Sequence, residues 1–335
     1  KEELAKVKDL LGSYTTNYST SSAGRCANIS VAAGKINGTV LYPGEEFSVG
    51  QTIGPLTAAG GYELAGAYEN GQTVQSYGGG VCQVSTTLYN AVLKAELEVT
   101  QRSNHSMIVT YVKPSMDAAI AGDYKDLKFV NNLDAPIYIE GYTVGKDIYF
   151  NIYGQETRPS NRKVTYESEV VSEEDPGTQF VATGDAVGSI STTQGKHMGY
   201  VARLWKIVTV DGVEQSRDAI NKSTYKSSPK IVNVGTASAD PNATAAVNAA
   251  LATGDEATIY ATVAQYSGAG QTPAETPAET PADGSAEAAA ILGTVDESQI
   301  TEIPQQKDSR IKHYESWKST GERTETFWFF KQIQP

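Results

Sequence analysis

The chain has 335 residues, with 27 Lys or Arg against 39 Asp or Glu, a formal net charge of -12 and an isoelectric point near 4.8. Nucleic-acid binding and attraction to anionic lipid both need a basic surface, so this charge argues against both partners. The chain contains no run of about 18 apolar residues, so we expect no membrane-spanning helix in it. Because it begins at Lys1 and not at Met, we expect a signal peptide or anchor to have preceded it.

Residues 1–158 predict a mixed α+β domain in which tight turns separate short strands. Pro43-Gly44 is typical of a turn, because Pro fixes φ and Gly tolerates positive φ. Asn70-Gly71 is a hairpin signal between two polar-apolar segments. Tyr77 follows this hairpin, and two roles are open for it: the wall of a peptide groove, or a half-buried position in a sheet.

A glycine run then leads to a cysteine at the start of a predicted helix. Residues 78–83 read Gly-Gly-Gly-Val-Cys-Gln, and apolar residues at helical spacing over 84–97 predict the helix. Unpaired N–H groups and the macrodipole stabilise a thiolate at a helix start, so we expect a lowered pKa for Cys82. Gly79 and Gly80 lack a Cβ atom, which would let a substrate peptide approach the sulfur.

The chain has three histidines, and one of them closely follows this helix. His105 precedes a segment, 107–112, whose composition predicts a strand. A cysteine nucleophile needs a base, and an imidazole titrates in the right range, so we predict that His105 is this base. His197 lies in a different composition block and His313 in a polar tail, so neither is favoured.

Two interpretations of the cysteines are open from the residues alone. Free cysteines are commonly buried as small hydrophobes, and in an exported protein Cys26 and Cys82 could simply pair. Alternatively, Cys82 is a reactive nucleophile. The spacing of the cysteines does not decide between a disulfide and a catalytic thiol.

The segment between Tyr14 and Tyr153 contains several motif blocks: 25–29, 36–48, 78–90, 104–106, 111–112, 117–118 and 126–131. These blocks resemble, in the same order, the motifs of the VanW family. The resemblance implies a cysteine L,D-transpeptidase that forms 3-3 cross-links in peptidoglycan, with Cys82 as its nucleophile. The His-Gly-Thr and Ser-x-Gly-Cys patterns of the better-known L,D-transpeptidase family are absent from the sequence. The family's Arg-x-x-Asn block does not require Cys26, which weakens the disulfide interpretation.

The same blocks suggest further site residues. Asp117 could orient the imidazole as the acid of a triad, or could be a surface turn residue. Arg25 could hold a substrate carboxylate in a bidentate fork, or form a structural ion pair. The N–H of Cys82 or Gln83, with the Gln83 amide, would stabilise the developing oxyanion. The residues assigned to substrate binding are Arg25, Tyr77, Gly79, Gly80, Gln83 and Ser106.

Residues 159–237 predict a small all-β module, because polar and apolar residues alternate between Asp-Gly and Pro-Gly turns. The module resembles the glycine-named β module of bacterial wall-acting proteins, which is proposed to bind N-acetylglucosamine. The likeness rests on Gly184, Gly188, Gly195, Gly199, Gly212 and Gly235 and on the closing Ile-x-x-Val-Gly-Thr. A passive spacer is the alternative role.

The C-terminal region is rich in Ala, Pro and Thr. Residues 238–290 hold an Ala-rich segment, with two helices expected over 241–266, and a Pro-Ala-Glu-Thr repeat at 272–281 that predicts a solvated linker. Residues 291–335 form an aromatic tail to which no motif assigns a role.

Three functions compete. The first is an L,D-transpeptidase; the second is a cysteine endopeptidase or carboxypeptidase that uses the same thioester; the third is a non-catalytic wall-binding adaptor. We expect an exported protein of the Gram-positive cell wall, with peptidoglycan stem peptides and glycan strands as partners and with no cofactor or metal. An adaptor would not need a reactive thiol, whereas both enzymes would.

Overall fold

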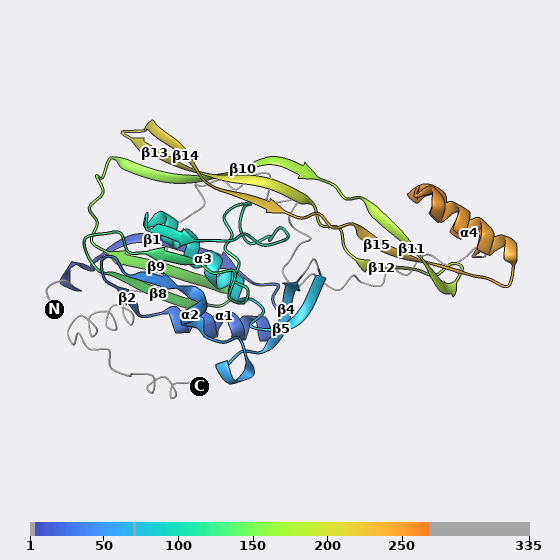
Figure 1. Cartoon of the computed structure of the whole chain (residues 1–335), viewed down its shortest axis with the longest axis horizontal. Coiled ribbons are helices and arrows are strands. Elements are labelled where there is room, and N and C mark those ends of the chain that lie inside the picture. The colour runs from blue at the N-terminus through green and yellow to red at the C-terminus, as the bar shows by residue number, and fades with distance from the viewer. Residues whose placement is uncertain (1–3, 70–71, 268–335) are drawn as a thin grey trace.

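The computed structural model describes residues 4–69 and 72–267. They form a mixed helix-and-sheet domain, an all-β module and a terminal pair of helices (Figure 1). The helices are α1 (Ala23–Ile36), α2 (Val49–Ile53), α3 (Val81–Lys94), α4 (Pro241–Thr253) and α5 (Glu256–Tyr266), with single 3-10 turns at Leu4–Lys6 and Ala58–Gly60. The mixed class predicted for the first domain is therefore present.

An antiparallel sheet is the base of the first domain. Its strands, in spatial order, are β1 (Asp9–Asn17), β9 (Asp147–Gly154), β8 (Ile137–Val144) and β2 (Thr39–Leu41). Helices α1 and α3 pack against this sheet and against each other. The core between them is apolar and fully buried, as at Ile29, Ile36, Leu88, Val92, Phe150 and Ile152. Burial of this apolar surface fixes α3, the helix that carries Cys82.

Helix α3 lies directly on β1 because a glycine leaves room for it. A Cβ atom on Gly12 would lie 2.3 Å from the carbonyl oxygen of Ala91. The helix begins at Val81, three residues before the position predicted from its apolar stripe. Gly80 makes this start possible, because it serves as N-cap with φ at 111°, a conformation that favours glycine. Cys82 therefore lies in the first turn of the helix.

Two smaller sheets complete the domain. One contains β3 (Glu46–Ser48), β7 (Lys128–Val130) and β6 (Glu98–Gln101); the other is the hairpin of β4 (Leu64–Glu69) and β5 (Gln72–Tyr77). The strand predicted over 107–112 is wrong, since this segment has no regular secondary structure. One of its apolar residues packs against the second module instead: Ile108 lies in one cluster with Tyr200 and Tyr225.

The second module is all-β, as the alternation of polar and apolar residues over 159–237 predicted. Its first sheet contains β10 (Arg162–Glu174), β13 (Gly199–Val210) and β14 (Val213–Tyr225). Its second contains β11 (Thr178–Ala186), β15 (Lys230–Ala237) and β12 (Ile190–Gln194), with β11 and β15 parallel. The first sheet lies beside α3, whereas the second sheet and α4 extend away from the first domain (Figure 1).

Helices α4 and α5 occupy the region where two helices were expected. Their buried residues, among them Val247, Ile259 and Val263, share a core with Val232 and Val234 of β15. The Pro-Ala-Glu-Thr repeat, the aromatic tail and His313 lie outside the described residues. Within residues 4–69 and 72–267, no helix has both the length and the apolarity that a bilayer crossing demands.

Candidate active site

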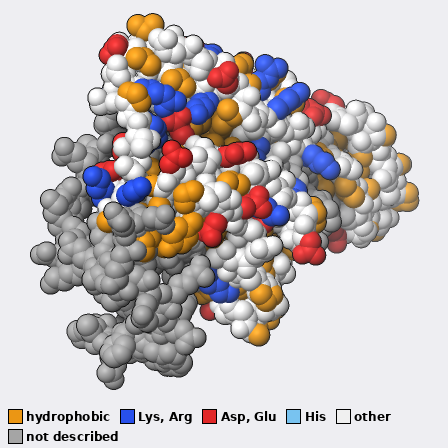
Figure 2. All heavy atoms as spheres, turned by 60° about the vertical axis from the view of Figure 1, so that its left-hand side comes forward, with side chains coloured by type: hydrophobic (Ala, Val, Ile, Leu, Met, Phe, Trp, Pro, Cys, Tyr) orange, Lys and Arg blue, Asp and Glu red, His pale blue; other side chains and the backbone are white. Residues whose placement is uncertain are grey.

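Cys82 opens onto a cavity of about 970 Å³ between the two domains. The half-buried thiol is flanked by the glycine run on one side and by residues 105–107 and 119–122 on the other. Residues of the second module complete the lining: Gln194, Lys226, Ser227 and Ser228. Acidic and basic side chains are interspersed over the molecular face in Figure 2. A continuous basic surface, which a nucleic acid would need, is not seen on the described part of that face.

The glycine run is explained by protein packing. A Cβ atom on Gly79 would lie 2.7 Å from the carbonyl oxygen of Gly66, and one on Gly80 would lie 2.9 Å from Cγ of Arg25. Both glycines line the cavity, but the space that they leave is filled by β4 and α1. Their lack of a Cβ atom therefore lets the hairpin and α1 approach the start of α3, and the path for a substrate past these glycines stays a prediction.

Buried polar side chains of α3 hold the loop that carries the other site residues. The Thr86 hydroxyl accepts from the N–H of Ala118 at 2.9 Å, and the Ser85 hydroxyl donates to the carbonyl of the same residue. Asn90 donates to the carbonyl of Met116 at 2.8 Å. Sequence analysis did not identify these anchors, because a polar residue on a predicted helix carries no sign of its partner.

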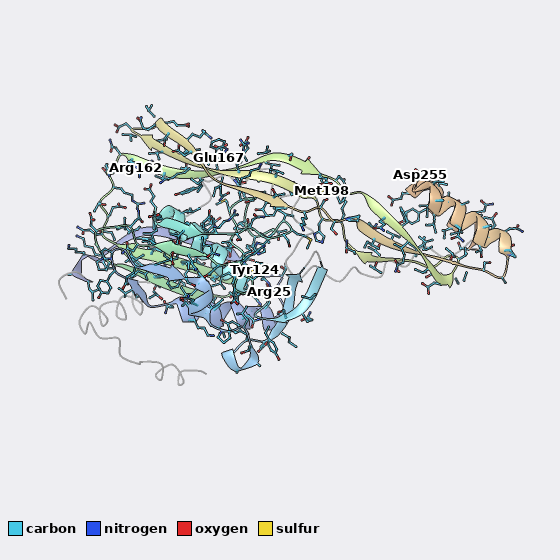
Figure 3. All side chains as sticks on the ribbon, in the orientation of Figure 1. Arg25, Tyr124, Arg162, Glu167, Met198 and Asp255 are labelled. Carbon is cyan, nitrogen blue, oxygen red and sulfur yellow. The ribbon has the colours of Figure 1, made fainter. Side chains whose placement is uncertain are left out.

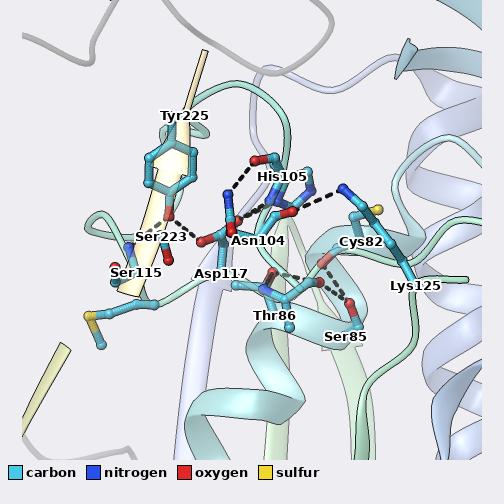
Figure 4. Close-up of polar contacts among 12 residues, drawn as sticks. Cys82, Ser85, Thr86, Asn104, His105, Ser115, Asp117, Lys125, Ser223 and Tyr225 are labelled. Atoms are coloured by element: carbon cyan, nitrogen blue, oxygen red, sulfur yellow. Dashed lines mark hydrogen bonds and ion pairs between the residues drawn. The ribbon is translucent and has the colours of Figure 1, made fainter. Parts of the chain in front are cut away.

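The anchored loop brings His105 and Asp117 to the sulfur (Figure 4). Nδ1 of His105 and Oδ2 of Asp117 are 2.7 Å apart, and the main-chain N–H of His105 donates to the same oxygen at 2.7 Å. The ring also interacts with the Cys82 thiol, which lowers the pKa of the thiol and raises the pKa of the imidazole. Since Nδ1 is used by Asp117, Nε2 is the ring nitrogen left for Cys82. The three residues thus form a thiol–imidazole–carboxylate series, the arrangement that activates nucleophiles on unrelated folds.

Asp117 is fully buried and is held by more than His105. Nη2 of Arg102 donates to Oδ1 at 2.9 Å, and Nε of Arg102 donates to the Asp117 carbonyl at 2.7 Å. The hydroxyl of Tyr225, at the end of β14, donates to Oδ1 as well. Asp117 is therefore not a surface turn residue, the alternative considered from sequence. Sequence analysis missed Arg102 and Tyr225; Arg102 stands three residues before His105, whereas Tyr225 lies in the other domain and carries no local signal.

These contacts shift all three pKa values in favour of an ion pair. Burial alone would raise the pKa of the Cys82 thiol, but the hydrogen bond and charge of His105, the Ile120 N–H and the charge of Arg25 lower it. Burial would lower the pKa of His105, yet Asp117 and Cys82 raise it to about 10. The pKa of Asp117 falls to about 2 despite its burial, because of His105, Arg102 and Tyr225. The geometry thus favours a thiolate beside an imidazolium.

The two cysteines are free, and they have different neighbours. The N–H of Ile120 donates to Sγ of Cys82 at 3.4 Å. Cys26 lies on α1, where Nζ of Lys146 is 2.9 Å from its sulfur. The disulfide interpretation therefore has no support in the fold.

The remaining predicted residues divide into two groups. Arg25, Tyr77 and Ser106 line the cavity, as does Tyr124; Arg25 and Tyr124 are labelled in Figure 3. Gln83 does not: its amide donates to Thr16 and to the Asn17 carbonyl and accepts from Arg25 at 2.9 Å. The assignment of Gln83 to substrate and oxyanion binding is therefore corrected, because its side chain is turned into the core, where it holds Arg25.

Comparison with known proteins agrees with these domains. Residues 24–153 match the family described as VanW like protein, and residues 167–237 match the G5 domain. YoaR of Bacillus subtilis (strain 168) is 37% identical over 146 residues, which cover 44% of this chain and 48% of YoaR. The vancomycin B-type resistance protein VanW of Enterococcus faecalis (strain ATCC 700802 / V583) is 30% identical over 118 residues, which cover 33% of this chain and 42% of that protein.

Solved structures are also among the proteins to which the chain is similar. An IgA1 protease G5 domain structure is 26% identical, with a TM-score of 0.18, and covers 23% of this chain and 94% of that domain. The chain spans just under half the length of the two curated relatives. It carries a VanW-like domain followed by a G5 domain, as the sequence blocks predicted. This combination supports a cell-wall-associated protein.

Proposed function

We propose that this protein is a peptidoglycan L,D-transpeptidase that forms 3-3 cross-links through a thioester on Cys82. The observation that carries the proposal is the series Cys82–His105–Asp117, with a half-buried thiol on the wall of a large cavity and a buried carboxylate behind the imidazole. A thiol with a lowered pKa beside a protonated imidazole is a nucleophile with its general acid already in place. A wall-binding adaptor would gain nothing from this arrangement.

The first half-reaction transfers a stem peptide to the enzyme. The Cys82 thiolate attacks the carbonyl carbon of the third stem residue and forms a tetrahedral oxyanion. As the bond to the terminal D-residue breaks, the imidazolium of His105 donates its Nε2 proton to the leaving amine. The products are a thioester on Cys82, neutral His105 and a free D-amino acid. Asp117 keeps Nδ1 protonated and the ring in this orientation throughout.

The second half-reaction forms the cross-link. The side-chain amine of another stem peptide attacks the thioester, and Nε2 of His105 takes the proton that this amine loses. The tetrahedral intermediate collapses to an amide and expels the Cys82 thiolate, which regains its imidazolium partner. Neither half-reaction needs a metal or an oxidant.

The start of α3 offers an oxyanion donor. The N–H groups of Val81 and Gln83 donate to the carbonyls of Gly78 and Gly80 at 3.0 Å. Among the main-chain hydrogen bonds that the described residues form outside their helices and strands, none uses the N–H of Cys82. The N–H of Cys82 lies in the first turn of α3, at the positive end of the helix dipole, and can donate a hydrogen bond to the developing oxyanion.

Arg25 supplies a positive charge for a substrate carboxylate. Its Nη1 donates to the neutral groups Ser21 and Gln83, and no acidic side chain of the described chain lies within ion-pair distance of it. The guanidinium is buried and lines the cavity. A buried cation without a carboxylate partner is costly, and an anionic stem peptide would relieve that cost.

A second cavity favours transfer over hydrolysis. It has a volume of about 640 Å³ and shares Leu56, Ile120 and Gly122 with the first cavity. The two cavities meet at Ile120, whose main chain contacts Sγ of Cys82. Asp123 lines the second cavity and would favour the ammonium group of an acceptor. A reaction that joins two stem peptides needs two such spaces, whereas hydrolysis needs one.

The test is incubation with disaccharide tetrapeptide, followed by mass analysis of the products. We expect the intact protein and its Cys26→Ala variant to form 3-3 dimers and the Cys82→Ala variant to form none. Release of tripeptide without dimers would replace the transpeptidase with a hydrolase. No product at all would leave the wall-binding adaptor.

A further inference from the structure

The second module reaches into the catalytic machinery at the end of β14. The hydroxyl of Tyr225 donates to Oδ1 of Asp117 and accepts from the main-chain N–H of Ser115 at 2.7 Å. Two residues earlier on the same strand, the hydroxyl of Ser223 accepts from Nη1 of Arg102 at 2.9 Å. Both Tyr225 and Ser223 are buried (Figure 4).

The donors around Asp117 show what this contact does. Oδ2 receives two hydrogen bonds, both from His105, and Oδ1 receives two, from Arg102 and Tyr225. A carboxylate offers about four acceptor directions, so this one is saturated. With both oxygens held, the carboxylate cannot turn about its Cβ–Cγ bond, and the imidazole keeps Nε2 toward Cys82. One of the two groups that hold Oδ1 comes from the second module.

The two domains are docked by polar contacts that fix their register. The carboxylate of Glu96, just after α3, pairs with Arg162 of β10 at 2.6 Å and with Lys206 of β13 at 2.7 Å. The Tyr166 hydroxyl donates to the carbonyl of Leu93 at the end of α3. A module that served only as a spacer would not need Tyr225 aligned with a buried carboxylate.

The module also forms a wall of the substrate cavity. The main-chain N–H of Lys226 donates to the carbonyl of Ser106 at 2.7 Å, which holds this end of the module at the cavity. Lys226, Ser227 and Ser228 line the same cavity as the glycine run.

We infer that the G5 module is a working part of this active site: Tyr225 is a positioning residue for the Cys82–His105–Asp117 series, and residues 226–228 form one wall of the substrate cavity. The role of the wall rests on the proposed function. The role of Tyr225 does not, because the reactivity of a thiol can be measured without any substrate.

The test compares two Tyr→Phe variants in a Cys26→Ser background, so that alkylation by iodoacetamide reports Cys82 alone. Tyr225→Phe removes the donor to Asp117. Tyr166→Phe, the matched control, removes a hydroxyl from the same interface but away from Asp117. We expect Tyr225→Phe to lower the alkylation rate at about pH 6 by about five- to tenfold, the factor that corresponds to one net hydrogen bond. We expect the rate for Tyr166→Phe to equal that of the parent.

Equal alkylation profiles for the parent and both variants, with similar losses of thermal stability, would overturn the inference, since Tyr225 would then only join the domains. If Tyr225→Phe does not fold, Ser223→Ala, which releases Arg102, takes its place with a smaller decrease of about two- to threefold expected. An unchanged profile for that variant would be equally contrary. Should the substrate assay yield no dimer while Tyr225→Phe lowers alkylation, the proposed reaction fails and the positioning role stands.

Discussion

Replacing Asp117 by Asn tests the electrostatic part of the site most sharply. The side chain keeps its shape but loses its charge and half of its acceptor capacity. Four hydrogen-bond donors converge on the carboxylate, two on each oxygen. In either orientation, the NH₂ group of the substituted amide would therefore face two donors with which it cannot form a hydrogen bond. One orientation breaks the contact with His105, and the other breaks the contacts with Arg102 and Tyr225.

The magnitude follows from the contact with His105. A hydrogen bond to a charged group contributes roughly 1.5 to 3 kcal/mol, which corresponds to roughly 10- to 150-fold in the population of the thiolate–imidazolium pair. The pKa of His105, raised to about 10 by Asp117 and Cys82 together, falls toward its ordinary value in the variant. We therefore expect the rate of Cys82 alkylation at about pH 6 to drop by about 10- to 150-fold.

The assay is iodoacetamide alkylation followed by intact mass, in a Cys26→Ser background. Asp147→Asn is the matched control: it makes the same change on β9, where the carboxylate contacts Asn17 and no site residue. Circular dichroism establishes that each variant is folded. A folded Asp117→Asn protein that is alkylated at the parent rate at about pH 6 would refute the proposed ion pair.

Two further predictions concern stability. Glu96→Gln weakens the contacts with Arg162 and Lys206. We therefore expect the free energy of unfolding, measured by urea denaturation, to fall by about 1 to 3 kcal/mol. The pKa of Glu96 in the folded protein is lowered to about 2. The contribution of its carboxylate to folding stability is therefore complete above the unfolded pKa of 4.5 and is lost as the pH falls toward 2. We expect the variant to lack this dependence of stability on pH. Gly12→Ala would force a Cβ atom against the Ala91 carbonyl, so we expect a loss of about 1 to 3 kcal/mol in thermal unfolding. If Glu96→Gln showed the same dependence of stability on pH as the parent, the account of Glu96 would be contradicted. An unchanged thermal unfolding midpoint for Gly12→Ala would contradict the account of Gly12.

Local patterns were sufficient for much of the architecture. The apolar stripe over 84–97 predicted α3, and alternation with Asp-Gly turns predicted the strands of the second module. Both signals depend on residues close together in the chain. The predicted start of α3 was late, because the stripe reports only the buried face and Gly80 permits an additional turn.

The contacts that shape the site are long-range, and no local pattern contains them. Tyr225 lies 108 residues beyond Asp117 and meets it only because β10, β13 and β14 dock beside α3. The strand predicted over 107–112 is wrong for a similar reason, since Ile108 packs against the other domain and not in a sheet. Gln83 was assigned to substrate because it follows Cys82, but successive residues of a helix point about 100° apart. Its side chain therefore faces α1 and β1.

The most direct test of the central claim is intact-protein mass spectrometry after rapid mixing with disaccharide tetrapeptide and acid quenching. We predict an adduct with the mass of the disaccharide tripeptide less one water, mapped to the peptide that contains Cys82 and absent from Cys82→Ala. Turnover of the tetrapeptide without this adduct, or an adduct on Cys26, would contradict the account.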